Sequence, residues 1–144
     1  MACVFCRIAN AEVAAHRVFE DELVVAFLDR GPIRPGHIQI IPRTHYVVFD
    51  DLPTEVANRM IAVGQELAKA LKTLSGVERV AFLFTGADVA HAHAHVVPMH
   101  EKTDITSRRY IVEEQLTFKA TPTASNRALT EMADRIRAAR KGTV

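Results

Sequence analysis

The run AHAHAHVVPM at residues 90–99 alternates alanine with histidine and then becomes apolar. On an extended strand successive side chains point to opposite faces, so His91, His93 and His95 are predicted to share one face. Residues two apart on a strand are about 6.5 to 7 Å apart at their Cα atoms, close enough for adjacent imidazoles to act on one ligand. The run therefore predicts a strand that carries a site for a phosphate group or a metal ion.

Two chemistries fit such a row of imidazoles, and the row by itself leaves both open. As metal ligands, three histidines supply the three protein donors of a catalytic zinc site that keeps one open position. As catalytic groups, one neutral imidazole attacks phosphorus while a neighbour assists the proton that the leaving group requires. Histidine serves either role because its ordinary pKa, about 6.5, leaves much of it neutral at pH 7.

The segments around this run predict a sheet. Short β-branched or apolar segments predict five strands, at residues 18–20, 23–28, 37–41, 80–85 and 90–99. The acidic break between the first two strands predicts a hairpin turn.

Two helices are also predicted. Apolar residues recur at spacings of three and four over residues 53–75, which indicates an amphipathic helix. Asp51 is expected to cap its start and Gly76 to end it. Ser125 is expected to cap a last helix with Leu129 on its apolar face. Hairpin strands with separate helices favour an α+β fold, an antiparallel sheet with helices packed on one face.

The composition bounds the class of protein. With 49% hydrophobic and 24% charged residues among 144, the chain is expected to be one globular domain, residues 1–144, and not a disordered or collagenous chain. A net charge of +1 without a basic block argues against a nucleic-acid partner. The longest apolar run, Leu23–Leu28, is far shorter than the roughly 20 residues that span a bilayer, and no signal-peptide pattern is present. No membrane partner and a cytoplasmic location are therefore expected, and in that compartment a Cys3/Cys6 pair favours metal ligation or redox chemistry.

Several motifs in order resemble those of one known family. The stretches CVFCRI, VFEDELVVAFLDR, PGHIQIIPRTH, DDLP and HAHAHVVP, between Cys3 and about His100, have the order and similar spacing of the histidine triad (HIT) superfamily. This superfamily contains nucleotide hydrolases and transferases, and the resemblance is to its bacterial Hint-like branch. It implies a HIT-like domain whose residues 101–144 form a divergent C-terminal segment ending in a helix.

The resemblance implies a catalytic role for three histidines. His93 is matched to the nucleophile that attacks the α-phosphorus of a nucleoside phosphate derivative and forms a nucleotidyl-histidine intermediate, which water then hydrolyses. His95 is matched to a residue that contacts the phosphate and assists proton transfer, and His37 to a fourth histidine that supports the nucleophile. The implied reaction cleaves nucleoside 5′-phosphoramidates or related phosphoanhydrides to a nucleoside monophosphate.

The resemblance also implies a nucleotide site and a homodimer. Asp29 and Arg30 fall where the ribose is contacted, and Phe5, Ile8 and Phe27 are candidates for the base pocket, although residues of these types are as often in a core. The expected substrate is a purine nucleotide, most simply one of adenosine. Family members are typically homodimers.

A structural zinc ion is implied as well. Many bacterial members bind zinc through a CxxC pair and two histidines, here Cys3, Cys6, His45 and His91. Two thiolates and two imidazoles satisfy the tetrahedral preference of zinc and leave no vacancy for catalysis. The ion is therefore expected to tie the N-terminus to the strand with the nucleophile.

One loop departs from the family pattern. Ala87 and Asp88 replace a Gln and a Ser or Thr that contact the transferred phosphate, and the carboxylate of Asp88 is expected to repel an anionic substrate. Arg108 and Arg109 can offset this charge, although a solvated surface pair is the simpler interpretation. Three alternatives therefore stay open: a nucleotide-binding or scaffold protein of low activity, a dinucleoside polyphosphate hydrolase, and a metallohydrolase with zinc on the triad.

Overall fold

A single antiparallel sheet organises the chain. The computed structural model describes residues 3–86, 88–106 and 121–142. Its five strands, all paired antiparallel, are arranged in the order β1-β2-β3-β5-β4. Their bounds are Arg17–Glu20 (β1), Val24–Leu28 (β2), Ile38–Pro42 (β3), Arg79–Phe84 (β4) and Ala94–Met99 (β5). The predicted α+β fold is confirmed.

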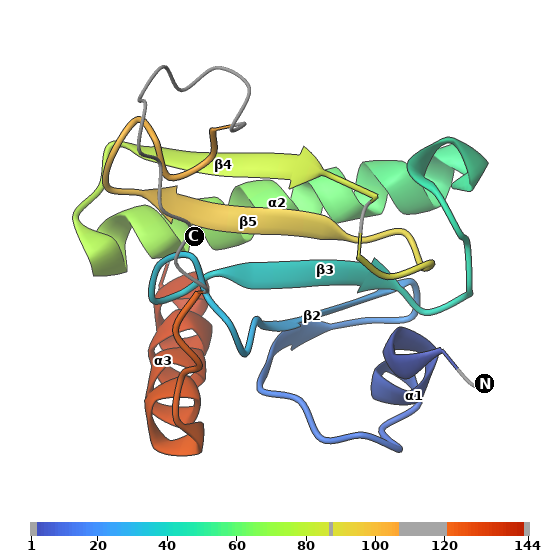
Figure 1. The fold of residues 1–144 in the computed structure, drawn as a ribbon, viewed down its shortest axis with the longest axis horizontal. Helices are drawn as coiled ribbons and strands as arrows, with labels where there is room; N and C mark the ends of the chain where they lie inside the picture. The colour runs from blue at the N-terminus through green and yellow to red at the C-terminus, as the bar shows by residue number, and fades with distance from the viewer. Residues whose placement is uncertain (1–2, 87, 107–120, 143–144) are drawn as a thin grey trace, which may run out of the picture.

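Three α-helices pack on this sheet (Figure 1). Helices α2 (Thr54–Ser75) and α3 (Asn126–Lys141) cover one face, where they bury Val24, Ala26 and Leu28 of β2. A short helix α1 (Val4–Ala9), which sequence reasoning missed, covers the other face over Val25 and Phe27. Strand β2 is buried at every position because both of its faces are covered. Within the described part of the chain, no helix has the length and apolar character that crossing a membrane requires.

The residues predicted to begin or end α2 and α3 do so, with one exception. Gly76 ends α2 in the left-handed conformation, with φ of +64°, and Ser125 caps α3 by accepting a hydrogen bond from the Ala128 amide, both as predicted. The prediction that Asp51 caps α2 is wrong. Pro53 occupies that position without a side-chain cap, and Asp51 instead ends a 3-10 turn, Phe49–Asp51.

The strand predicted for residues 90–99 is shorter than expected. Strand β5 begins at Ala94, so His91 and His93 lie in the irregular segment before it. Pairing with β3 stops at Ile40 and Ala94, and the carbonyl of Pro42 further along β3 lies 3.0 Å from Nε2 of His91. The His91 side chain therefore bonds to the Pro42 carbonyl, which would accept a backbone hydrogen bond if the pairing of β3 and β5 continued.

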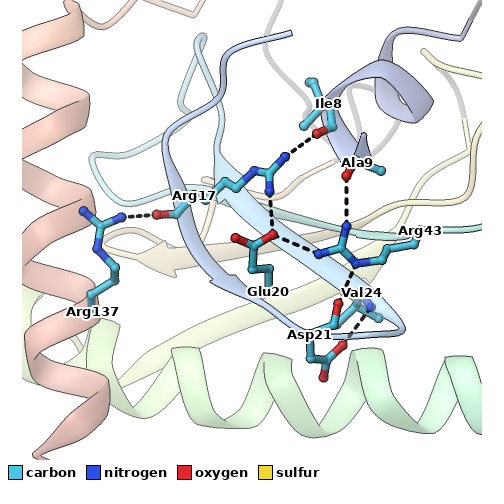
Figure 2. A network of polar contacts seen from close by, with 8 residues as sticks. All are labelled: Ile8, Ala9, Arg17, Glu20, Asp21, Val24, Arg43 and Arg137. Carbon is cyan, nitrogen blue, oxygen red and sulfur yellow. Dashed lines mark hydrogen bonds and ion pairs between the residues drawn. The ribbon is translucent and has the colours of Figure 1, made fainter. Parts of the chain in front are cut away.

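Two arginines hold the C-terminal end of α1 against the sheet (Figure 2). Arg17 of β1 donates to the Ile8 carbonyl at 2.6 Å, and Arg43, after β3, donates to the Ala9 carbonyl at 2.9 Å. The carboxylate of Glu20 bridges the two guanidinium groups, at 2.5 and 2.8 Å. Cations are favourable at a helix C-terminus, where carbonyl groups lack partners, so this network stabilises a helix too short to persist alone.

Candidate functional site

His93 is held in one tautomer by the backbone. Its Nδ1 lies 2.7 Å from the carbonyl oxygen of His91, which only accepts, so Nδ1 carries the proton. In the neutral ring the lone pair is therefore on Nε2, which no hydrogen bond engages among the described residues. The ring is only 3% exposed and packs on Phe5 and His95, with ring centroids 5.2 and 5.0 Å away. A neutral imidazole with a free Nε2 is the form that a nucleophile requires.

A chain of hydrogen bonds fixes the next two histidines. The amide of Ile33 donates to Nδ1 of His37 at 3.1 Å, so the proton of His37 is on Nε2. This Nε2 lies 2.9 Å from Nδ1 of His95 and donates to it. His95 consequently keeps its own proton on Nε2, and it is a hydrogen-bond donor toward any group bound beside it.

Burial keeps these imidazoles neutral. It lowers the pKa of His37 from 6.5 to about 4, against the opposing charge of Asp29. Burial also lowers the pKa of His95, and His93 adds to that effect, while Asp29 and Asp88 oppose it. At neutral pH the hydrogen-bond chain is therefore composed of uncharged rings.

The four predicted metal ligands are gathered at one point. The ligand atoms of Cys3, Cys6, His45 and His91 all lie within 4.8 Å of one another. Neighbouring pairs are closer: Nδ1 of His91 is 3.4 Å from Sγ of Cys3 and 3.2 Å from Nδ1 of His45, and Sγ of Cys6 is 3.3 Å from Nδ1 of His45. Tetrahedral zinc, bound at about 2.3 Å to sulfur and about 2.0 Å to nitrogen, separates such atoms by about 3.3 to 3.6 Å. The donor set and its spacing therefore fit a zinc ion.

The surroundings of His91 also suit a metal ligand. Nε2 of this fully buried ring donates to the Pro42 carbonyl, which leaves the lone pair on Nδ1 facing the cysteines. A backbone carbonyl in this position orients a metal-bound imidazole. Burial lowers the pKa of His91 and so favours the neutral, ligating form.

The triad is consequently divided between two places. His91 belongs to the cysteine cluster, and His95 is grouped with His37 and Asp29. His93 belongs to neither group. The described geometry thus favours the nucleophile over three histidines that share one ion.

A first cavity gathers the residues predicted to bind the base and ribose. It has a volume of about 200 Å³, and its walls include Phe5, Ile8, Phe27, Asp29, Arg30 and Gln39. The first three are buried between α1, which carries Phe5 and Ile8, and the sheet, which carries Phe27, so they are core residues as well as cavity wall. Apolar walls with a few polar groups at one end are typical of small-molecule sites, and we call this the nucleoside cavity.

A second cavity lies beside His37 and His95, two of the three histidines predicted to be catalytic. It has a volume of about 570 Å³, shares Asp29 with the nucleoside cavity, and is lined by His37, His95, Asp88 and Asp104 among others. We call it the distal cavity. Arg108 and Arg109, considered above as balancing charges, lie outside the described residues.

Gln39 is a site residue that the sequence reasoning did not select. Its Nε2 donates to Oδ2 of Asp29 at 2.6 Å, and its Oε1 is buried without a hydrogen-bond partner in the described structure. A signal was available, because Gln39 is two residues after His37 on a predicted strand and so points to the same face. With the Gly31 amide, it holds the carboxylate of Asp29 between the two cavities.

The fold and the site together define a class: an α+β protein with a Cys2His2 cluster and a buried imidazole whose Nε2 is free. His93 lines neither cavity itself, but it packs on Phe5 of the first and His95 of the second. The chain belongs to the HIT family, since the HIT domain model matches residues 10–102. An uncharacterised HIT-like protein of Methanocaldococcus jannaschii is 36% identical over 69% of this chain and 80% of its own length.

Two further comparisons bear on the chemistry. The adenosine 5′-monophosphoramidase of Saccharomyces cerevisiae is 31% identical over 70% of this chain and 65% of its own length. A zinc-bound histidine triad family protein from Mycobacterium smegmatis is 30% identical, with a TM-score of 0.76 over 99% of this chain and 95% of that one.

Proposed function

We propose that this HIT protein is a nucleotide hydrolase that cleaves purine nucleoside 5′-phosphoramidates to the nucleoside monophosphate through a nucleotidyl-His93 intermediate. The observation that carries the proposal is the tautomer of His93, whose backbone-bound Nδ1–H leaves the Nε2 lone pair free. The similarity to a yeast enzyme named as an adenosine 5′-monophosphoramidase supports adenosine as the nucleoside.

The nucleotide is expected to lie with its base between Phe5, Ile8 and Phe27, in the nucleoside cavity. The carboxylate of Asp29, held by Gln39 and the Gly31 amide, is suited to accept hydrogen bonds from the ribose hydroxyls. In this pose we expect the α-phosphate to face the histidines and the leaving group to occupy the distal cavity.

The reaction then has two steps, each a displacement at phosphorus. In the first, the bond from Nε2 of His93 to phosphorus forms as the P–N bond breaks, and the departing amine takes up one proton from solvent. In the second, a water oxygen bonds to phosphorus, the bond to His93 breaks, and one proton is released. Nε2–H of His95 donates a hydrogen bond to the phosphoryl oxygens, and His37 holds His95 in the tautomer that permits this.

The cysteine cluster is proposed to hold a structural zinc ion. Cys3, Cys6, His45 and His91 supply four protein ligands, and a zinc-bound relative with the same fold supports this assignment. A bound zinc ion would supply cross-linking and no catalysis, because four protein ligands leave it no open position. His91 would join the ion to the segment that carries His93.

The decisive experiment looks for the intermediate. The protein is mixed with an adenosine 5′-phosphoramidate, quenched within milliseconds and digested, and the peptides are weighed by mass spectrometry. Wild type and the exposed-histidine control His100→Ala should carry an adenylate on the His93 peptide, whereas His93→Ala should carry none and lose at least about 10³-fold in turnover.

Two outcomes would contradict the proposal. Turnover by His93→Ala at the wild-type rate would exclude nucleophilic catalysis by this residue. Tight AMP binding without turnover by wild type would instead favour a nucleotide-binding protein of low activity.

A further inference from the structure

The distal cavity is lined with negative charge. Three of its residues are carboxylates, Asp29, Asp88 and Asp104, and none of its described lining residues is Lys or Arg. Its two imidazoles, His37 and His95, are kept neutral at pH 7 by burial. A group that enters this cavity therefore meets negative charge, unless the carboxylates have their own counterions.

Only one of the three carboxylates has a counterion in the described structure. Asp104 accepts two hydrogen bonds from Nε and Nη2 of Arg34, at 3.0 and 2.8 Å, and its side chain is 8% exposed. The Arg34 guanidinium and neighbouring amides hold the pKa of Asp104 below its ordinary value, although burial opposes them. The charge of Asp104 is thus already neutralised.

The other two carboxylates have no Lys or Arg partner among the described residues. Asp29 bonds to neutral donors, the Gly31 amide and the Gln39 side chain. Asp88 is exposed, and within the described residues no hydrogen bond or ion pair engages it. Its carboxylate is nevertheless close enough to act on His95, whose pKa it raises against the effect of burial.

We propose that Asp88 selects substrates by the charge of the leaving group, favouring amines that bear a second, positively charged ammonium group and disfavouring anionic leaving groups. This inference rests on the proposed function and deepens it. Because Asp29 is committed to the ribose, Asp88 is the carboxylate of the distal cavity that stays available to the leaving group.

The selection requires no extra chemical step. The bond from His93 Nε2 to phosphorus forms and the P–N bond breaks for each substrate, and the distant ammonium or carboxylate of the leaving amine is unchanged. What differs is the Coulomb energy of that distant charge beside Asp88. Since Asp88 is exposed, added salt should screen the difference, which a steric effect would not show.

The test uses three adenosine 5′-phosphoramidates of equal chain length, made from 1,4-diaminobutane, butylamine and 4-aminobutyrate. Values of kcat/KM are measured for wild type, Asp88→Asn and Asp88→Lys, at low and high salt. The readout is the ratio of the cationic to the anionic substrate within one variant, in which any loss of folding or of chemistry cancels. Glu22→Gln, at the exposed turn between β1 and β2, is the matched control for loss of one carboxylate.

We expect a wild-type ratio of at least about tenfold at low salt, a similar ratio in Glu22→Gln, a fall toward one in Asp88→Asn and a reversal in Asp88→Lys. High salt should reduce the wild-type ratio. A ratio that is the same in wild type and Asp88→Asn would overturn this inference while leaving the proposed function intact. Failure of wild type to cleave any of the three substrates would instead overturn the proposed function.

Discussion

At the scale of single residues, the backbone decides which nitrogen of each histidine is available. A carbonyl opposite Nδ1 of His93 and another opposite Nε2 of His91 leave opposite nitrogens free in two residues of the same motif. This difference is what the proposed roles require, a nucleophile at His93 and a metal ligand at His91. The repeated His-x-His pattern does not show this difference, because it depends on the carbonyl groups of His91 and Pro42 that each ring meets in the folded chain.

The burial of His37 predicts an acid-sensitive stability. Its pKa is about 4 in the folded protein and near 6.5 when unfolded, so the unfolded state binds more protons between these values. Stability should therefore fall as the pH falls from about 6.5 to about 4, by about 3 kcal/mol from this residue alone, and the contribution should not grow further below pH 4. Urea unfolding at pH 7, 5.5 and 4.5 measures it.

The variant His37→Gln should reduce this pH dependence, leaving the smaller part that comes from other buried histidines such as His95, whereas the exposed-histidine control His100→Gln should keep the wild-type slope. The lowered pKa values of Asp21 and Asp104 affect stability in a lower window, because carboxylates begin to lose such a contribution only near their ordinary value of 3.8. Equal slopes in wild type and His37→Gln would show that burial of this ring does not control the acid response.

Residue types and their spacing were enough to select most candidate residues of the site. The alternating histidines, the CxxC pair and Asp29 were all selected from sequence. The structure places the two cysteines with His45 and His91, and Asp29 on one cavity wall with Phe5 and Phe27. What sequence alone could not give is the environment of a group. Asp104 is paired with Arg34 across 70 positions of the chain, whereas Asp88 has no partner among the described residues, and the sequence does not show this difference.

At the scale of elements, α1 is the part of the fold that local signals did not predict. Six residues are too few to display a helical period, and no side chain caps its N-terminus. Its stability comes from elsewhere in the chain, through Arg17 and Arg43 at one end and the cysteine cluster at the other. The longer α2 was predicted because, over its 22 residues, the spacing of apolar residues repeats through several helical turns.

The position of α1 predicts that the proposed zinc ion influences nucleotide binding. Phe5 lies between the two cysteines in sequence, lines the nucleoside cavity and packs on His93. Removing zinc should free the N-terminal end of α1, lower the melting temperature by about 5 °C and weaken AMP binding about tenfold. Metal analysis, thermal unfolding and calorimetric titration with AMP would measure these effects, and Cys6→Ser should reproduce them.

Restoring zinc to the stripped wild type should restore both properties, whereas Cys6→Ser should not recover. Unchanged melting temperature and AMP affinity after complete removal of the metal would contradict the structural role. Complete loss of turnover in a stripped protein that remains folded and binds AMP would point to the metallohydrolase alternative.

At the scale of the whole molecule, the two edges of the sheet differ. The β1 edge is partly covered by α3, from which Arg137 donates to the Arg17 carbonyl (Figure 2). The β4 edge is open in the described structure, and beside it Ile61 of α2 and Phe82 of β4 are 45% and 37% exposed. Open edges with exposed apolar side chains are sites where strands or subunits associate.

This edge predicts the interface of the expected homodimer. The apolar residues Ile61, Ala68, Val80 and Phe82 form a shallow hollow across α2 and β4, which a second copy of the same surface would cover about a two-fold axis. Light scattering after size exclusion should give the mass of a dimer for wild type and of a monomer for Phe82→Glu, because a charge at the centre of an apolar interface is costly to bury. Val4→Glu, which places the same charge at an exposed apolar position on α1, should remain dimeric. A monomeric wild type at all concentrations would refute the dimer, and a dimeric Phe82→Glu would move its interface to another surface.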